Sequence, residues 1–233
     1  MTLLILAIAP SMLIIAYVYF KDKFEKEPWT LLLKNFILGG TVSVLLTFII
    51  GGLLTKFLPT LESNSILDMF IKAFFVVALV EEFSKYLIVR FAAQRNKEFN
   101  EPYDGIVYAV AVSMGFAALE NVLYVYSYGF ETGLFRAFTA VPAHATFAIL
   151  MGYYMGKAKF SENRFLLNMI GLGVATLFHG AYDFFLFINF VPGIALGAFA
   201  SLFVGILLSR KAMKLHRNNS LFKSVNTSSQ GES

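Results

Sequence analysis

Two adjacent glutamates, Glu81 and Glu82, lie inside a long apolar segment and are followed by a lysine, Lys85. Glu81 and Lys85 are four residues apart, so on a helix they share a face and can form an ion pair. Glu82 lies about 100° further round the helix, which allows both carboxylates to border one cavity. Because two neighbouring carboxylates in a dry site cannot both ionise cheaply, one of them should hold its proton. The stretch therefore offers an acid beside a base, as hydrolysis requires, whereas an ion pair that only locks two helices together is the simpler alternative.

Two further apolar segments carry polar side chains. Glu120 and Asn121 follow the small-residue stretch 113–118, and His144 follows Pro142 by two residues. A charged residue in the middle of a membrane helix costs about 2.5–3.5 kcal/mol even on the most lenient scale, so Glu120 needs an explanation. Asn121 could equally well hydrogen-bond a neighbouring helix or take part in catalysis. Pro142 should bend its helix just before His144, because proline removes a backbone hydrogen bond.

A third such segment contains His179 and Asp183, which are four residues apart. On a helix, Asp183 could fix the tautomer of the imidazole, or both side chains could point at one ligand. Counted inward from the predicted segment ends, the polar residues of all four segments fall at or outside the middle of the membrane. We therefore expect one polar cluster that opens toward the outer face and contains Glu81, Glu82, Glu120, His144, His179 and Asp183.

The composition is that of a membrane protein. Of the 233 residues, 58% are hydrophobic and only 15% are charged, against about 25% charged in soluble domains. A membrane helix needs about 20 apolar residues, and seven segments qualify: 3–20, 31–57, 66–91, 104–128, 134–156, 165–190 and 191–209. We predict an all-α, polytopic bundle of about seven spans. Residues 1–209 form its single transmembrane domain, with the motif-bearing core at 66–190, and residues 210–233 form a basic, disordered tail.

The charge pattern predicts the topology and excludes several kinds of chemistry. Lysine and arginine concentrate in the loops after the first, third and fifth segments and in the tail, which places the N-terminus outside and the C-terminus in the cytoplasm. The net charge of +4 reflects this topology and does not indicate nucleic-acid binding. The absence of cysteine excludes disulfides, thiolate metal sites and cysteine nucleophiles. The chain also lacks the His-Glu-x-x-His helix of zinc proteases.

Five motifs occur in a fixed order between residues 81 and 183. They are Glu81-Glu82-x-x-Lys85, Glu101-Pro102-x-Asp104-Gly105, Gly115-Phe116-Ala117-x-x-Glu120-Asn121, Pro142-x-His144 and His179-x-x-x-Asp183. In these motifs the chain resembles the PrsW family, bacterial intramembrane proteases that cut anti-sigma factors. More distantly it is similar to the CAAX-protease-like superfamily, in which a Glu-Glu pair precedes Phe-x-x-x-His and His-x-x-x-Asn. Here Glu120 stands in place of the first histidine and Asp183 in place of the asparagine, which makes the site richer in acid.

The resemblance implies an enzyme of the bacterial plasma membrane. Its expected activity is hydrolysis of a peptide bond in a single-pass membrane anti-sigma factor near the outer face, the site-1 cut of a regulated proteolysis cascade. Glu81 is then expected to activate water, with Glu82 as its protonated partner and Lys85 tuning the pair. His179 would steady the oxyanion. The remaining candidates are Glu120 as a further catalytic residue and Asn121, His144, Asp183 and Glu101 as supporting residues; Glu101 is expected at the cytoplasmic end, beside Asp104.

Two alternatives stay open at this point. In the first, the same protease depends on a divalent metal such as zinc, with Glu120, His144 and His179 as ligands, whereas the preferred mechanism requires no cofactor. In the second, the chain is a proton-coupled transporter, because buried glutamate, histidine and lysine also form proton relays. The lack of an inverted repeat weighs against the transporter.

Overall fold

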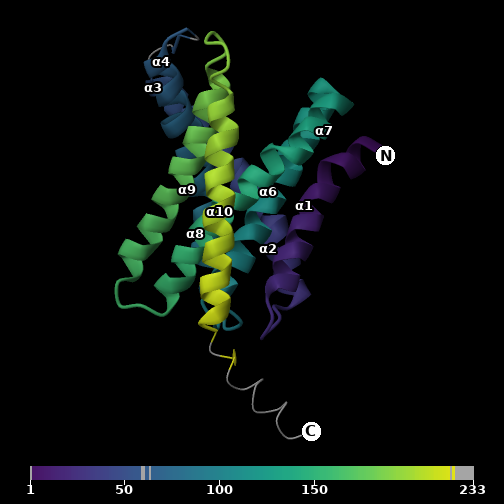
Figure 1. Ribbon diagram of the computed structural model, residues 1–233, viewed down its shortest axis with the longest axis vertical. Coiled ribbons are helices and arrows are strands. Elements are labelled where there is room, and N and C mark those ends of the chain that lie inside the picture. The colour runs from purple at the N-terminus through teal and green to yellow at the C-terminus, as the bar shows by residue number, and fades with distance from the viewer. Residues whose placement is uncertain (1, 59–60, 63, 221, 224–233) are drawn as a thin grey trace, which may run out of the picture.

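The structure is a computed structural model that describes residues 2–58, 61–62, 64–220 and 222–223, and all regular elements within them are helices (Figure 1). This confirms the predicted all-α bundle. In chain order the elements are α1 (Thr2–Lys21), α2 (Trp29–Leu38), η1 (Gly39–Ser43), α3 (Val44–Phe57), α4 (Ile66–Ile71), η2 (Lys72–Ala78), α5 (Leu79–Ile88), η3 (Val89–Ala93), α6 (Asp104–Tyr128), α7 (Phe130–Phe138), α8 (Ala140–Lys159), α9 (Arg164–Phe187) and α10 (Leu196–Asn218).

Counting α7 and α8 together, these elements form seven helical segments in the described part of the chain, and six of them are long and apolar enough to cross a membrane. The seventh run is Ile66 to Ala93, in which α4, η2, α5 and η3 follow one another without a break. At 1.5 Å per residue this run is about 40 Å long, enough to cross a bilayer. This run differs from the other six in its charged residues, because it contains Glu81, Glu82 and Lys85.

The fifth predicted span, 134–156, corresponds to two helices and not to one bent helix. α7 ends at Phe138 and α8 begins at Ala140, with Thr139 between them in a non-helical conformation. Pro142 explains the break, because its ring would clash with the carbonyl group four residues earlier, which belongs to Phe138. The proline thus lies in the first turn of α8, where its missing N–H is tolerated, and the predicted bend is a break three residues before it.

The last predicted span, 191–209, is shifted toward the C-terminus. α10 begins at Leu196 and continues to Asn218, so residues 210–218 of the predicted disordered tail are helical. The basic residues of this segment do not end the helix, because lysine and arginine are good helix formers. Residues 221 and 224–233 of the predicted tail lie outside the described residues.

Helix α6 is the centre of the bundle and packs against α1, α2 and α8. Its residues 104–118 are all buried. Glycines allow the close approach: a Cβ atom on Gly115 would overlap the backbone of Phe36 in α2, and one on Gly152 in α8 would overlap the backbone of Gly105. Small residues at such crossings are typical of membrane helix packing.

The bundle has two distinct ends. The start of α1 and helix α7 lie toward one end of the long axis, and α10 ends at the opposite end (Figure 1). We call these the α7 end and the α10 end. Termini on opposite sides agree with an odd number of crossings. The α7 end is the one that the charge pattern predicts to face outward.

Candidate active site

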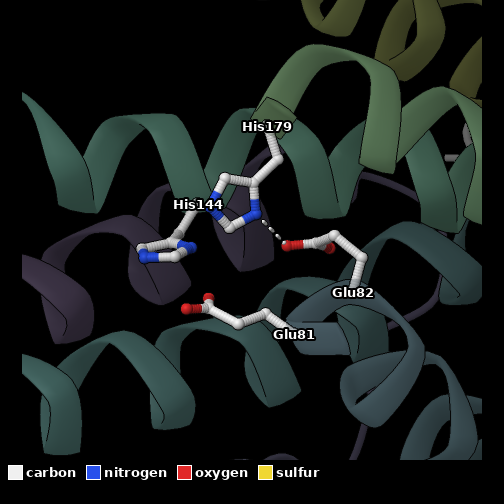
Figure 2. A group of neighbouring side chains, drawn as sticks. All are labelled: Glu81, Glu82, His144 and His179. Carbon is white, nitrogen blue, oxygen red and sulfur yellow. Dashed lines mark hydrogen bonds and ion pairs between the residues drawn. The ribbon is translucent and has the colours of Figure 1, made fainter. Parts of the chain in front are cut away.

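Four side chains from three helices converge inside the bundle. Glu81 and Glu82 project from α5, His144 from α8 and His179 from α9, and their polar ends meet in one small volume (Figure 2). One ligand-type atom of each residue lies within 4.8 Å of the corresponding atoms of the other three. All four side chains are buried, although Glu81 retains 9% of its accessible surface.

Lys85 contacts three of these four side chains. Its Nζ atom lies 2.7 Å from Oε1 of Glu82, 3.3 Å from Oε2 of Glu81 and 3.2 Å from Nδ1 of His144. The ring of Phe116 covers the same ammonium group at 4.1 Å from its centroid. A buried charge is tolerated only when it is paired and hydrogen-bonded, and the spacing Glu81-Glu82-x-x-Lys85 supplies both carboxylates on one helix face.

Glu120 lies behind His144 and connects it to an arginine. Oε2 of Glu120 is 2.9 Å from Nε2 of His144 and accepts a hydrogen bond of 2.7 Å from Nη2 of Arg136. Because the ammonium group of Lys85 can only donate, Nδ1 of His144 must accept, and Nε2–H donates to Glu120. Asn121 accepts a hydrogen bond of 2.7 Å from Nε of Arg136, so it positions the arginine.

His179 lies between two carboxylates. Its Nδ1 atom is 2.9 Å from Oε1 of Glu82, and its Nε2 atom is 3.4 Å from Oδ2 of Asp183. Both ring nitrogens are therefore placed to donate. The ring of Phe147 stacks on the imidazole at a centroid distance of 5.0 Å. The helical spacing of His179 and Asp183 thus brings the carboxylate against the ring, which is one of the two arrangements that the sequence left open.

A cavity of about 550 Å³ connects this cluster to the α7 end. Its wall includes Glu81 but not Glu82, and it also includes the other polar side chains of the cluster together with apolar residues of η2, α7, α8 and α9. The polar residues of the wall are Lys72, Glu81, Glu120, Tyr124, Thr132, Arg136, Thr139, His144, His179, Tyr182 and Asp183. Glu81 is therefore the member of the glutamate pair that a substrate or a water molecule in the cavity can reach.

The structure brings together every predicted site residue except Glu101, which lies at the α10 end, where the sequence analysis expected it. Asn121 contacts Arg136 and the carbonyl group of Ala7 and so has a positioning role. The sequence analysis missed Arg136, whose side chain faces the cavity. One signal could have found it, since a buried Glu120 needs a cationic partner.

Comparison with known proteins agrees with these motifs. A family model described as "PrsW family intramembrane metalloprotease" matches residues 27–209. The chain belongs to the PrsW family. Among curated relatives named "Protease PrsW", the protein of Oceanobacillus iheyensis is 40% identical over 80% of this chain and 83% of its own length. The relative from Clostridioides difficile is 38% identical over 81% and 80%, and that from Bacillus subtilis is 36% identical over 77% and 80%. No solved structure matches the chain.

Membership of the PrsW family makes the chain a peptidase and a multi-pass protein of the bacterial cell membrane. This decides between the protease and the transporter that the sequence left open. Large apolar side chains exposed on the long helices, such as Leu13, Phe48 and Phe203, are suited to contact lipid.

The family description implies a metal, and the four converging side chains are of types that bind metals. Two histidines and two glutamates offer the nitrogen and oxygen donors that zinc takes, and Oε2 of Glu82 is buried without a hydrogen-bond partner. Glu120, expected as a ligand from the sequence, is not in this group of four, because its carboxylate is engaged by His144 and Arg136. The ammonium group of Lys85 contacts three of the four donors and would share them with the metal.

Proposed function

We propose that this peptidase cuts a single-pass membrane anti-sigma factor near the outer face of the membrane, as the first step of a signalling cascade. The resemblance of the motifs supports this substrate. The cavity supports the position of the cut, because its wall includes Thr132, Phe135 and Arg136 of α7, and the positive-inside rule places the α7 end outside. One observation carries the proposal, namely that the Glu81 carboxylate lies on the wall of the cavity and beside a buried cation.

In the proposed reaction Glu81 is the general base. It takes a proton from water as the water oxygen attacks the scissile carbonyl carbon, and it then gives that proton to the leaving amine nitrogen when the C–N bond breaks. Glu82 accepts hydrogen bonds from both Lys85 and His179, so we propose that it stays ionised and that Glu81 is the member of the pair that gains and loses the proton. The sequence analysis expected Glu82 to be protonated, so this assignment differs for Glu82, whereas Glu81 keeps the role of general base.

We assign the oxyanion contact to His179. Its Nδ1–H is held by Glu82, and its Nε2–H, whose contact with Asp183 is longer, is the donor that can be shared with a developing negative charge in the cavity. His144, Glu120 and Arg136 form the opposite wall and position the substrate chain. These roles require the ring orientations that Phe147 and Asp183 fix.

A metal-dependent version of the same reaction has its own support. Four carboxylates of the cluster, Glu81, Glu82, Glu120 and Asp183, face two fixed cations, Lys85 and Arg136. His179 is placed to donate through both ring nitrogens and His144 accepts from Lys85, so a surplus of one negative charge remains when all four carboxylates are ionised. A divalent metal held by Glu81, Glu82, His144 and His179 would neutralise that surplus and would polarise the scissile carbonyl group.

The test is cleavage in a defined system. The purified protein is reconstituted with a candidate single-pass substrate, with and without a chelator, and the products are sequenced. A cut near the outer face supports the proposal. Products that arise only from the cytoplasmic side, or no cut in any anti-sigma factor of the producing bacterium, would contradict it. Activity that survives the chelator, in protein without bound metal, excludes the metal-dependent version.

A further inference from the structure

A second group of acidic side chains lies at the α10 end. Its five carboxylates belong to Asp22, Glu25 and Glu27 between α1 and α2, to Glu101 between η3 and α6, and to Asp104 at the start of α6. We call these five residues the acidic cluster. Asp104 and Glu120 are sixteen residues apart on α6, so the acidic cluster is roughly 24 Å from the candidate active site.

The carboxylates of the acidic cluster converge. Single oxygen atoms of Asp22, Glu101 and Asp104 lie within 4.8 Å of one another, and so do those of Glu25, Glu27 and Asp104. Asp104 therefore joins two trios. Asp22, Glu27, Glu101 and Asp104 are each at most 2% exposed, so water does not separate these charges. Like charges at this spacing repel strongly in a dry environment.

Each of these carboxylates has an oxygen atom that nothing in the described part of the chain satisfies. The buried side-chain oxygens without a hydrogen-bond partner are Oδ2 of Asp22, Oε2 of Glu25, Oε1 of Glu27, Oε1 of Glu101 and Oδ1 of Asp104, together with Oδ1 of the neighbouring Asn100. Buried polar atoms are nearly always paired, and six orphaned acceptors in one place require a common explanation.

In three of these carboxylates the other oxygen accepts a hydrogen bond from the protein. Oδ2 of Asp104 accepts hydrogen bonds of 2.7 Å from the backbone N–H groups of Asn100 and Glu101. The hydroxyl of Tyr108 donates to Oε2 of Glu27, and that of Ser220 donates to Oε2 of Glu101. Three carboxylates are thus fixed through one oxygen, and the second oxygen of each is left for a ligand.

The lysine nearest along the chain, Lys26, does not donate to the unsatisfied oxygens. Lys26, in the same loop, donates to the backbone carbonyl groups of Tyr19 and Asp22. Protons shared between carboxylates are the remaining way to satisfy these oxygens from within the protein. Such shared protons cannot satisfy six acceptors from two loops at once. An external cation can, because it binds several carboxylate oxygens together.

We propose that the acidic cluster binds a hard divalent cation of the Mg²⁺, Ca²⁺ or Mn²⁺ class. The donors are all oxygen, carboxylate with one amide, and include neither nitrogen nor sulfur, which is the ligand set these ions prefer over zinc. The ion joins the α1–α2 loop, the η3–α6 loop and the start of α6. Through the hydrogen bond between Ser220 and Glu101 it also steadies the end of α10.

The proposal is tested by counting bound Mn²⁺ on the full chain in detergent micelles after metal has been stripped with a chelator. Free Mn²⁺ is read by electron paramagnetic resonance during titration with the metal alone. The E101Q/D104N variant should bind one Mn²⁺ fewer than the wild type, and Mg²⁺ or Ca²⁺ should displace that ion from the wild type. Equal stoichiometry in both proteins would overturn the proposal, whatever the candidate active site binds.

Two further variants control for folding and for surface charge. E98Q removes an exposed carboxylate from the same loop and should bind Mn²⁺ as the wild type does. E25Q removes the least buried member of the acidic cluster, so it should fold, and it should weaken the same Mn²⁺ site on the order of tenfold. Unchanged affinity in E25Q together with normal stoichiometry in E101Q/D104N would show that the carboxylates hold shared protons instead.

Discussion

At the scale of single residues, the two glutamates of the pair differ because their partners differ. Glu82 is held by two donors and lies off the cavity wall, whereas Glu81 has one longer contact with Lys85 and lines the cavity. The same sequence motif therefore provides one carboxylate that is fixed and one that can exchange a proton with a bound molecule. Arg136, which lines the cavity and pairs with Glu120, is the second fixed cation of the site.

Arg136 is expected to act as a positioning residue through Glu120 and His144. The substitution Arg136→Gln should lower kcat about 10–100-fold with a smaller effect on KM, because Glu120 loses its partner and His144 its orientation. Arg136→Lys should restore part of the rate, since an ammonium group can pair with Glu120 but cannot also reach Asn121. Lys56→Gln, an exposed charge on α3, is the control. Equal losses in Arg136→Gln and Arg136→Lys, with reduced helicity, would indicate a structural role only.

At the scale of elements, the site depends on how closely α8 approaches α6. Pro142 sets the start of α8, and the hydroxyl of Ser113 in α6 donates to the carbonyl group of His144 at 3.0 Å. The backbone contact between Gly152 and Gly105 fixes the distance between the two helices further along. A change there should reach His144 without any change in the chemistry of the cluster.

The substitution Gly152→Ala should therefore destabilise the bundle by about 1–3 kcal/mol, because the added methyl group overlaps the backbone of α6. Proteolysis should also slow. Gly173→Ala in α9 is the matched control, since no atom lies within 4 Å of the added methyl group. Thermal unfolding in micelles measures both effects. A Gly152→Ala protein as stable as the Gly173→Ala protein would refute the close packing of α6 on α8.

The acidic cluster predicts how pH affects the α10 end in metal-free protein. Burial raises the pKa of Asp22 and of Glu27 to about 7. Glu101 and Glu25 add to the shift at Asp22 and Lys26 opposes it, while Glu25 and Asp22 add to the shift at Glu27 and the hydrogen bond from Tyr108 opposes it. The native state thus keeps protons that the unfolded chain releases near pH 4, so stability should fall as the pH rises from about 4 to about 7.

Hydrogen exchange of the α1–α2 loop in chelator-treated protein measures this dependence. After correction for intrinsic exchange rates, opening should be more frequent at pH 7.5 than at pH 5. Added Mg²⁺ should suppress the opening at pH 7.5, and the variant Asp22→Asn/Glu27→Gln should have a weaker pH dependence, since burial also raises the pKa of Glu25 and of Glu101, which remain. More frequent opening at pH 5 than at pH 7.5 would contradict the raised pKa values.

At the scale of the whole molecule, the energetic cost of charge in lipid explains what the sequence could predict. Six ionisable residues in apolar segments would each be costly to place alone in a membrane, and the fold brings all six into one cluster. The helical spacing of Glu81 with Lys85 and of His179 with Asp183 predicted two of its ion pairs. The apolar segments predicted seven spans, and six helices in the described part of the chain are long and apolar enough to cross a membrane.

Other features depend on contacts between segments far apart in the chain. Arg136 lies in a short helix, α7, which the sequence analysis did not separate from the fifth span, and the packing of α7 on α6 brings it to Glu120. The break at Thr139 reflects a clash between Pro142 and a carbonyl group that sequence patterns do not locate to the residue. The acidic cluster combines two loops that are about 75 residues apart, so nothing in either loop predicted it.

The central claim is that Glu81 activates water for cleavage of a peptide bond in a membrane-spanning substrate. The most direct measurement compares the wild type with the Glu81→Gln and Glu131→Gln variants in proteoliposomes that contain a single-pass anti-sigma factor. Glu131 is an exposed glutamate of α7 at the same end of the bundle. Glu81→Gln should lower the rate of cleavage by about 10²–10⁴ with unchanged helicity, while Glu131→Gln should cleave normally. Cleavage by the Glu81→Gln protein at the wild-type rate would contradict the account.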